Sequence, residues 1–356
     1  MQRVYRILVI NPGSTSTKVA LYENETSIFE HNIGHNPEEI ARCKHIADQY
    51  PLRRDAVLGA LSEAGFGPND LDAVVGRGGM LRSVPSGTYL VNRRLLDDCW
   101  KMQERQHVAN LGAVLAREIA PDGVPAYMVD PVSVDEFDAI ARVAGLPGFE
   151  RRSLSHALNT KAMARVAAAQ LGQPYEAVNL VVAHMGGGIS VSAHRRGRMV
   201  DVNQALDGTG PFSPERAGGL PVGDVMRMAC SGKYTYDELF VLISRRGGLL
   251  AHLGTNDAKE VERRIEAGDE HAELIYRAMA YQIAKEIGLM ATVLLGDVQA
   301  IVLTGGLAYS TLLVPWIRER VEWIAPLIVL PGHEEMLAMT QGALRVLRGQ
   351  EAAKEY

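Results

Sequence analysis

The chain contains the same short pattern twice: an apolar strand, a glycine-containing turn and a second strand with alternating apolar positions. The first copy is RILVINPGSTSTKVALYE at residues 6–23, and the second is LVVAHMGGGISVSAH at residues 180–194. When the turns are aligned, His184 takes the place of Asn11. Two such hairpins predict a duplicated fold with a nucleotide between the halves, although two short elements can also match by chance.

Short apolar runs alternate with helical stretches along the chain, which is typical of an α/β protein. Strands are expected at 6–10, 71–76, 126–129, 179–183, 189–193, 300–304 and 327–330. Helices are expected at 38–50, 54–65, 92–102, 110–119, 154–171, 236–244, 258–267, 270–295 and 311–323. The segment GLPGFERRS at 145–153 has the glycine, proline and charge content of a domain boundary. We therefore expect domains at 1–150 and 151–333, with a C-terminal helix at 334–356 completing the first.

The composition and charge of the chain argue against several classes of protein. The 356 residues are 47% hydrophobic and 22% charged, which suits a soluble chain of two domains. A net charge of -5 without a basic run argues against nucleic acid or a membrane surface as partner. Without a long apolar window or a signal peptide, a cytoplasmic location is expected. Cys43, Cys99 and Cys230 are far apart, so they support neither a disulfide framework nor a zinc site.

Hydroxyl side chains and a lysine follow the first turn, at Ser14 to Lys18. Hydroxyls, backbone amides and an ammonium group together form a pocket for an anion such as phosphate. A Walker loop would need a second glycine and a following helix. Here β-branched residues flank the turn and favour a hairpin instead. The alternative is an ordinary hairpin rich in serine and threonine.

A third glycine turn lies in AIVLTGGLAYSTLLVPWIRERV, residues 300–321. This pattern predicts a buried strand, a turn at Gly305 and Gly306, and an amphipathic helix. The N-terminus of that helix can receive a phosphate, or the glycines can let a nucleotide approach the backbone closely. Because two glycines often follow a strand, this pattern alone is a weak indication.

Several segments, in this order, resemble the butyrate kinase branch of the acetate kinase family, within the actin and hexokinase superfamily. They are VINPGSTSTK, VGRGG, SHALN, AHMGGGISV, DGTGPFSPERAGGLP, LTGGLA and LPGHEEMLAMTQGALRVL. NPGSTSTK together with SPERAGGLP is closer to butyrate kinases than to acetate kinases. The resemblance implies two duplicated ribonuclease-H-like (actin-like ATPase) domains around a central cleft. It also implies phosphoryl transfer from ATP with Mg²⁺ to a short-chain carboxylate such as butanoate.

The resemblance further implies which residues contact the nucleotide and how the chain assembles. The first domain would carry the acyl substrate and the second the nucleotide, in a homodimer or higher homo-oligomer. The residues implied in nucleotide binding are Asn11, Ser14, Ser16, Lys18, Gly186, Gly187, Gly188, Gly305 and Gly306.

Two arginines are candidates for the reacting groups. A carboxylate nucleophile is already anionic, so phosphoryl transfer to it needs positioning and positive charge rather than a strong base. Arg216, in the loop SPERAGG, offers a planar fork to the transferring phosphoryl group, with a surface salt bridge as the alternative. Arg77 lies between two glycines at a strand end, where it could hold the substrate carboxylate. It could instead be a buried arginine paired with a structural acid.

Two histidines and two acids complete the catalytic candidates. His156 opens a helix and His184 ends a strand, positions where a histidine is more often a satisfied core residue, but the resemblance implies phosphoryl contacts for both. For Asp130, at a strand end, the resemblance implies a role in placing Mg²⁺ or orienting an arginine, and the alternative is that it caps a turn. Of Glu334 and Glu335 we choose Glu334 as the metal-linked acid, although both could be first-turn acids of the last helix.

The segments SHALNTK and HMGGG depart from the acetate kinase pattern, so acetate is the less expected substrate. Butyrate, isobutyrate, valerate and branched-chain acids all remain open. Two other classes of function also remain. A sugar or polyol kinase would use Asp130 as a base on a hydroxyl, and a non-catalytic actin-like switch would respond to nucleotide by domain closure.

Overall fold

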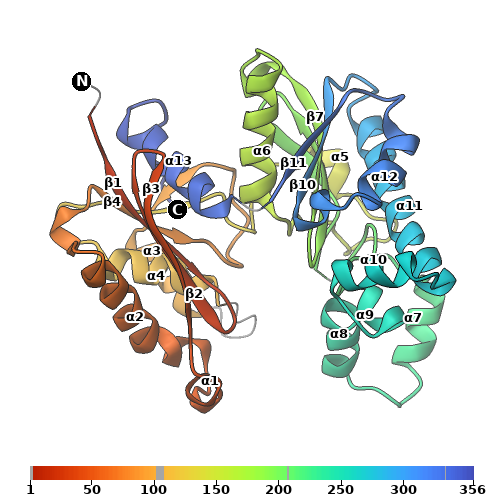
Figure 1. Ribbon diagram of the computed structural model, residues 1–356, viewed down its shortest axis with the longest axis horizontal. Coiled ribbons are helices and arrows are strands. Elements are labelled where there is room, and N and C mark those ends of the chain that lie inside the picture. The colour runs from red at the N-terminus through yellow and green to blue at the C-terminus, as the bar shows by residue number, and fades with distance from the viewer. Residues whose placement is uncertain (1–2, 102–107, 207, 333) are drawn as a thin grey trace. The chain divides into compact units, whose positions relative to one another are not determined.

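The structure of the protein is a computed structural model, which describes residues 3–101, 108–206, 208–332 and 334–356. The chain divides into two compact units, shown in Figure 1: residues 1–134 with 334–356, and residues 135–333. Met102 of an expected helix lies outside the described residues, as do Asp207 and His333 of the quoted motifs.

The first unit is built on a six-stranded sheet of order β3-β2-β1-β4-β6-β5. Its strands are β1 (Arg6–Pro12), β2 (Ser16–Glu23), β3 (Thr26–Gly34), β4 (Ala73–Arg77), β5 (Thr88–Leu90) and β6 (Ala126–Val129). Strands β1, β4 and β6 are parallel, whereas β1–β2, β2–β3 and β5–β6 pair antiparallel. Its helices are α1 (Pro37–Arg42), α2 (Tyr50–Glu63), α3 (Arg93–Lys101), α4 (Asn110–Ile119) and α13 (Glu335–Leu347), with 3₁₀ turns at Ile46–Gln49 and Pro68–Asp70.

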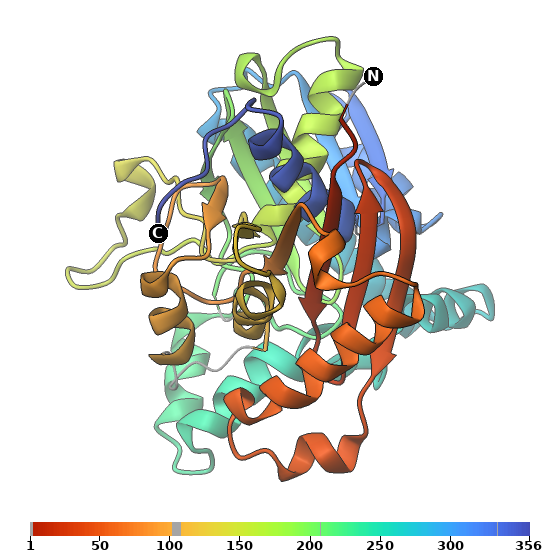
Figure 2. The ribbon, with the colours of Figure 1, turned by 90° about the vertical axis from the view of Figure 1, so that its left-hand side faces the viewer.

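Helices cover both faces of this sheet. Because side chains alternate along a strand, Leu8 and Ile10 point to one face and pack with Val57 and Leu61 of α2 and with residues of α4. Figure 2 views this face, with the orange α2 crossing in front of the red strands. Helix α13, from the other end of the chain, packs on β1, β4 and β6. The alternation thus places Asn11 on a face different from that of Ile10.

The second unit is built on a five-stranded sheet of order β11-β10-β7-β8-β9. Its strands are β7 (Asn179–Met185), β8 (Ile189–Arg195), β9 (Arg198–Val202), β10 (Ala300–Gly305) and β11 (Leu327–Pro331). Its helices are α5 (Ala139–Arg142), α6 (Ala157–Gln170), α7 (Val222–Ala229), α8 (Tyr236–Arg245), α9 (Gly248–Leu253), α10 (Ala258–Glu266), α11 (Glu270–Val293) and α12 (Leu313–Val321), with 3₁₀ turns at Tyr175–Ala177 and Gly306–Tyr309. Helices α6 and α11 both pack on the central β7.

The two sheets share one topology, which confirms the predicted duplication and the α/β class. In each unit a central strand pairs antiparallel with the next strand of the chain and parallel with a later one. Asn11 is the penultimate residue of β1 and His184 that of β7. Turns at 13–15 and 186–188 then lead into the return strands β2 and β8. The alignment made from sequence is therefore the structural one.

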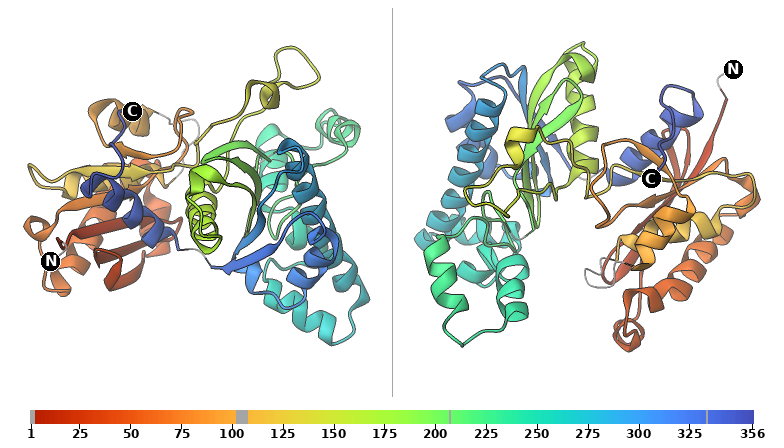
Figure 3. Two further views of the ribbon diagram at one scale, coloured as in Figure 1. Left: turned by 90° about the horizontal axis from the view of Figure 1, so that it is seen from above. Right: turned by 180° about the vertical axis from the view of Figure 1, so that it is seen from behind.

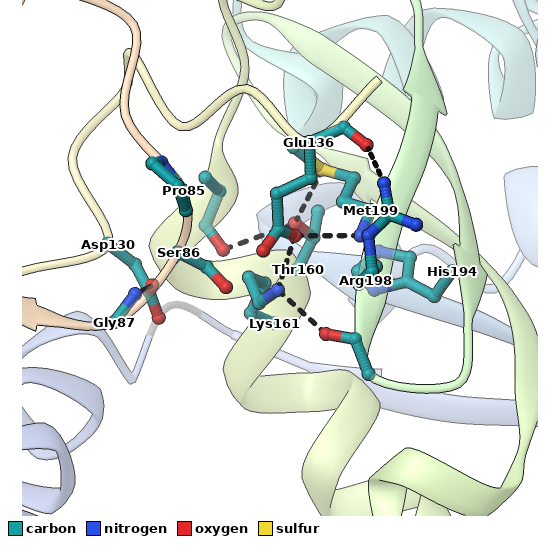
Figure 4. A network of polar contacts seen from close by, with 12 residues as sticks. Pro85, Ser86, Gly87, Asp130, Glu136, Thr160, Lys161, His194, Arg198 and Met199 are labelled. Atoms are coloured by element: carbon teal, nitrogen blue, oxygen red, sulfur yellow. Dashed lines mark hydrogen bonds and ion pairs between the residues drawn. The ribbon is translucent and has the colours of Figure 1, made fainter. Parts of the chain in front are cut away.

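The division between the units falls at 134/135, whereas the sequence placed it at 150. Residues 135–150 join the second unit because their polar groups are bonded there. Lys161 of α6 donates to Glu136 Oε2 at 2.8 Å, and the amide of Met199 donates to the same oxygen at 2.9 Å. Figure 4 shows this contact, and Figure 3 shows the yellow segment with α5 beside the second sheet.

Several elements differ from the sequence prediction. The helix expected at 38–50 is α1 followed by the 3₁₀ turn Ile46–Gln49. Strands β3, β5 and β9 and helices α5, α7 and α9 were not predicted. These elements are short, and β3 is also largely exposed, so each offers few positions over which a hydrophobic period can be recognised. Within the described ranges, no helix combines the length and apolar character needed to cross a bilayer.

Candidate functional site

Candidate residues of the first unit gather at one edge of its sheet. Asn11 is near the end of β1, Arg77 ends β4, and Asp130 follows β6. Because these strands are parallel, their carboxyl ends lie at the same edge, which is where open α/β sheets bind ligands. Sequence positions separated by more than a hundred residues are thereby brought into one neighbourhood.

Arg77 is paired with a carboxylate from the C-terminal helix. Its Nη1 lies 2.5 Å from Glu335 Oε2, and Asn11 Nδ2 donates to the same oxygen at 2.8 Å. The Arg77 side chain is 10% exposed, and its Nε has no hydrogen-bond partner among the described residues. The pairing of a buried arginine with an acid, one of the two interpretations from sequence, is thus present in the structure.

The acid that pairs with Arg77 is Glu335, whereas Glu334, the metal-linked acid expected from the sequence, makes no part of this ion pair. Glu334 is exposed and precedes the first turn of α13, where it contributes, after burial and Glu30, to raising the pKa of Tyr22 to about 12. One step along a helix rotates a side chain by about 100°, so only one of two adjacent glutamates can point at Arg77. The sequence could not show which one.

Close packing of glycines fixes the backbone around Arg77. A Cβ on Gly76 would lie 2.0 Å from the carbonyl oxygen of Gly112 in α4, and one on Gly78 would lie 2.6 Å from Pro131 Cβ. Gly76 lets β4 and α4 approach each other more closely than side chains allow, and Gly78 does the same for the chain at the end of β6. The glycines in VGRGG therefore have a packing role, and Arg77 extends from a rigid strand end.

Asp130 holds a turn. Its Oδ1 accepts a hydrogen bond from the amide of Gly87 at 2.7 Å, and its own amide donates to the Gly87 carbonyl at 3.1 Å. The residue is 3% exposed and has φ of 37°, which is costly for any residue but glycine. One carboxylate oxygen is thus already bonded to the backbone, as in the turn-capping interpretation.

The first hairpin turn is supported from beneath by an arginine that the sequence analysis did not identify. Arg53 of α2 is fully buried and donates to the carbonyl oxygens of Gly13 at 2.9 Å and Ser16 at 2.9 Å. Lys18, in contrast, has its ammonium 2.6 Å from Glu30 Oε1 and is 40% exposed. Arginines are common in helices, so no local pattern distinguished Arg53.

The second unit brings its two candidate histidines together. The rings of His156 and His184 stack with centroids 4.1 Å apart and planes at 19°. His184 Nδ1 lies 2.7 Å from Asn159 Oδ1, and His156 Nδ1 lies 2.8 Å from Ser190 Oγ. Because an amide oxygen only accepts, Nδ1 of His184 carries the proton. Asn159 and Ser190, which orient the rings, were missed because their role depends on a contact between α6 and the β7–β8 hairpin.

Arg216 lies against the second hairpin turn. Its Nη1 donates to the Ala205 carbonyl, and a Cβ on Gly188 would lie 2.2 Å from that nitrogen. Ser213 ties the two loops together, because its Oγ donates to the Gly187 carbonyl at 2.6 Å and accepts from the Arg216 amide at 3.1 Å. Burial lowers the pKa of Arg216, with Glu215 acting against the shift. Within the described ranges, no carboxylate forms an ion pair with this guanidinium.

The third glycine turn connects β10 to a 3₁₀ turn and then to α12. Gly305 ends β10 with φ of 87°, and a Cβ there would lie 2.3 Å from the Met185 carbonyl oxygen. A 3₁₀ turn follows, and α12 begins only at Leu313, whose amide is capped by Ser310 Oγ at 2.8 Å. The helix expected at 311–323 is thus α12, separated from Gly305 and Gly306 by the 3₁₀ turn, and Gly305 is needed for close packing on β7.

The fold is mixed α/β with two sheets that share a common strand arrangement. It is similar to an acetate kinase from Porphyromonas gingivalis, with 20% identity, a TM-score of 0.79 and coverage of 96% of this chain and 99% of that one. A propionate kinase from Francisella tularensis has 18% identity, a TM-score of 0.78 and coverage of 95% and 98%. An acetate kinase from Entamoeba histolytica has 14% identity, a TM-score of 0.77 and coverage of 95% and 99%.

At these identities the similarity establishes the fold. A second similarity comes from the sequence itself, since residues 150–321 match the model of the acetokinase family. The matched segment includes His156, His184 and Arg216 together with the turn at 186–188. The family match therefore covers the histidine pair and the arginine of the second unit.

Proposed function

We propose that this chain is an ATP-dependent kinase of short-chain carboxylates, with butanoate as the preferred acceptor and butanoyl phosphate and ADP as products. The observation that carries the proposal is the acetokinase family match at 150–321, which contains the oriented histidine pair and Arg216. The sequence segments NPGSTSTK and SPERAGGLP support the butyrate kinase branch over the acetate kinase branch.

The residues suit transfer to an anionic nucleophile. A carboxylate needs no general base, so the chain must supply positive charge and alignment. Arg216 would contact the γ-phosphoryl group through its planar guanidinium, and His184 and His156 would donate to its oxygens. Arg77 would hold the acid, with Asn11 and Glu335 fixing its guanidinium. The turns at 13–16 and 186–188, with Gly305 and Gly306, would contact the nucleotide.

A divalent cation fits this arrangement only as a partner of the nucleotide. Among the described residues, no group of three or more His, Cys, Asp or Glu side chains could hold a metal ion by itself. Mg²⁺ commonly uses one or two carboxylates together with phosphate oxygens and waters. Asp130 and Glu334 would be these carboxylates, since Glu335 already pairs with Arg77 and Asn11, and Mg²⁺ would neutralise phosphate charge there.

A panel of acids with ATP and hydroxylamine tests the proposal, because acyl phosphates give hydroxamates and sugar phosphates do not. Acetate, propionate, butanoate, isobutanoate, valerate and hexanoate would be compared by kcat/KM. Each buried methylene contributes about 0.8 kcal/mol, so two methylenes predict about a 15-fold preference for butanoate over acetate.

The same panel distinguishes the other classes of function. A sugar or polyol kinase would release ADP with sugars but form no hydroxamate with any acid. A nucleotide switch would bind ATP, and its ADP release would not respond to acids. No stimulation by any acid of two to six carbons would refute the proposal. Oligomeric state is a separate prediction, homodimer or higher, which light scattering after gel filtration would measure.

A further inference from the structure

The Arg53 guanidinium contacts both the first hairpin turn and Gln49. It makes six hydrogen bonds and is fully buried. Its Nη groups donate to the carbonyl oxygens of Gly13, Ser14 and Ser16 at 2.9, 3.3 and 2.9 Å and to Thr17 Oγ1 at 2.9 Å. Nε and Nη2 donate to Gln49 Oε1 at 3.1 and 2.8 Å. All acceptors in this set are neutral.

A buried cation with neutral acceptors alone is electrostatically unfavourable. Buried charges are normally paired, and Arg53 makes no ion pair with a carboxylate among the described residues. Arg53 also lies in the first turn of α2, where the helix dipole disfavours positive charge. Burial lowers the pKa of the neighbouring His35, and the Arg53 charge lowers it further, with Glu39 acting in the opposite direction. The positive charge beneath the turn is thus not balanced by the groups around it.

The same hydrogen bonds set the direction of the turn's peptide groups. In a trans peptide unit the carbonyl and the N–H point in opposite directions. Because the carbonyls of Gly13 and Ser14 point inward to Arg53, the amides of Ser14 and Thr15 point outward. Both residues are exposed, and no acceptor for either amide is present in the part of the chain that the structure describes. Successive outward amides over a buried cation are the arrangement of an anion-binding turn.

We propose that Arg53 is a positioning residue that holds the turn at 13–16 open for the phosphates of ATP and supplies the positive charge beneath them. The inference rests on the proposed function and deepens it, because it assigns an anion-binding role to a buried residue that touches no substrate. The bound phosphate would be the counter-ion that the free protein lacks at this position.

Gln49→Glu is the decisive variant. It preserves the shape of the side chain and places a carboxylate against Arg53, at the oxygen that already accepts two of its hydrogen bonds. A buried pair would then neutralise Arg53 without removing it. We expect the thermal unfolding temperature to stay equal or rise, while the Kd for MgATP, measured by calorimetry without acid, rises about tenfold or more. A purely structural role predicts no loss of MgATP affinity in a protein of equal or greater stability.

Arg53→Lys and Arg54→Lys form a matched pair. Lysine at 53 keeps the charge but cannot reach the three carbonyls at once, so the KM for ATP should rise while the KM for butanoate stays within about twofold. Arg54, the next residue, is paired with Asp55 at 2.8 Å and partly exposed, so its lysine variant should match wild type.

An unchanged Kd for MgATP in a folded Gln49→Glu protein would overturn the inference. If wild type binds MgATP but phosphorylates no acid, the proposed function fails and this inference stands.

Discussion

Replacing Gly188 with alanine would place a methyl group where the Arg216 guanidinium now lies. The new Cβ would be 2.2 Å from Nη1 and 2.6 Å from Cζ of Arg216, whereas ordinary contacts begin at 3.4 Å. The guanidinium must therefore move by roughly 1 Å, and a displacement of that size at a reacting centre costs about 10²-fold in rate. We expect kcat to fall by about that factor, which corresponds to about 2.7 kcal/mol.

The measurement is the hydroxamate assay with saturating ATP and butanoate, together with thermal unfolding of each variant. The apparent KM values should change by no more than about threefold, because Arg216 would act mainly in the transition state. Gly187→Ala tests the same turn without the clash, since its Cβ would lie 3.5 Å from Glu215, and it should lose less activity than Gly188→Ala.

Gly288→Ala, in α11, is the control for the glycine-to-alanine change itself. A Cβ at position 288 would meet no atom within 4 Å, so this variant should keep wild-type turnover and gain up to about 1 kcal/mol of helix stability. Turnover of Gly188→Ala within about threefold of wild type, in a protein that unfolds at a similar temperature, would refute the role given to the position of Arg216.

The remaining predictions concern the two arginines and one buried histidine. Arg216→Ala should lower kcat by about 10³-fold or more, and Arg216→Lys should recover little, because an ammonium cannot present two parallel donors; turnover within about tenfold would make Arg77 the candidate clamp. Arg77→Lys should raise the KM for butanoate and leave the KM for ATP nearly unchanged, and equal changes in both would contradict its assignment to the acid. Burial lowers the pKa of His194 to about 3 from 6.5, so between these pH values the unfolded chain binds one more proton and stability falls as pH falls, by up to about 1.4 kcal/mol per unit. Urea titrations of wild type and His194→Gln at pH 7 and 5.5 check this, and equal pH dependence of the two would exclude His194 as the cause.

Local patterns in the sequence were sufficient for the main elements of the fold. The expected helix at 110–119 coincides with α4, and the expected hairpins coincide with β1–β2 and β7–β8. These segments have a strong hydrophobic period or a glycine turn between β-branched runs, which are signals carried by neighbouring residues. The duplication was predictable for the same reason, because both hairpins repeat a pattern that is complete within about twenty residues.

Contacts between segments far apart in the sequence decided which site residues meet and where the two units divide. Glu335 rather than Glu334 reaches Arg77 because α13 returns from the end of the chain to the first sheet with one particular rotation. The segment that contains Glu136 belongs to the second unit because Lys161 of α6 donates a hydrogen bond to the Glu136 carboxylate.

Arg53 supports the turn at 13–16 only because α2 packs behind β2. The sequence by itself determined which residues could do the chemistry and at which turns. The tertiary structure decided which of them meet, because side-chain direction and the packing of helices on sheets depend on residues far apart in the chain.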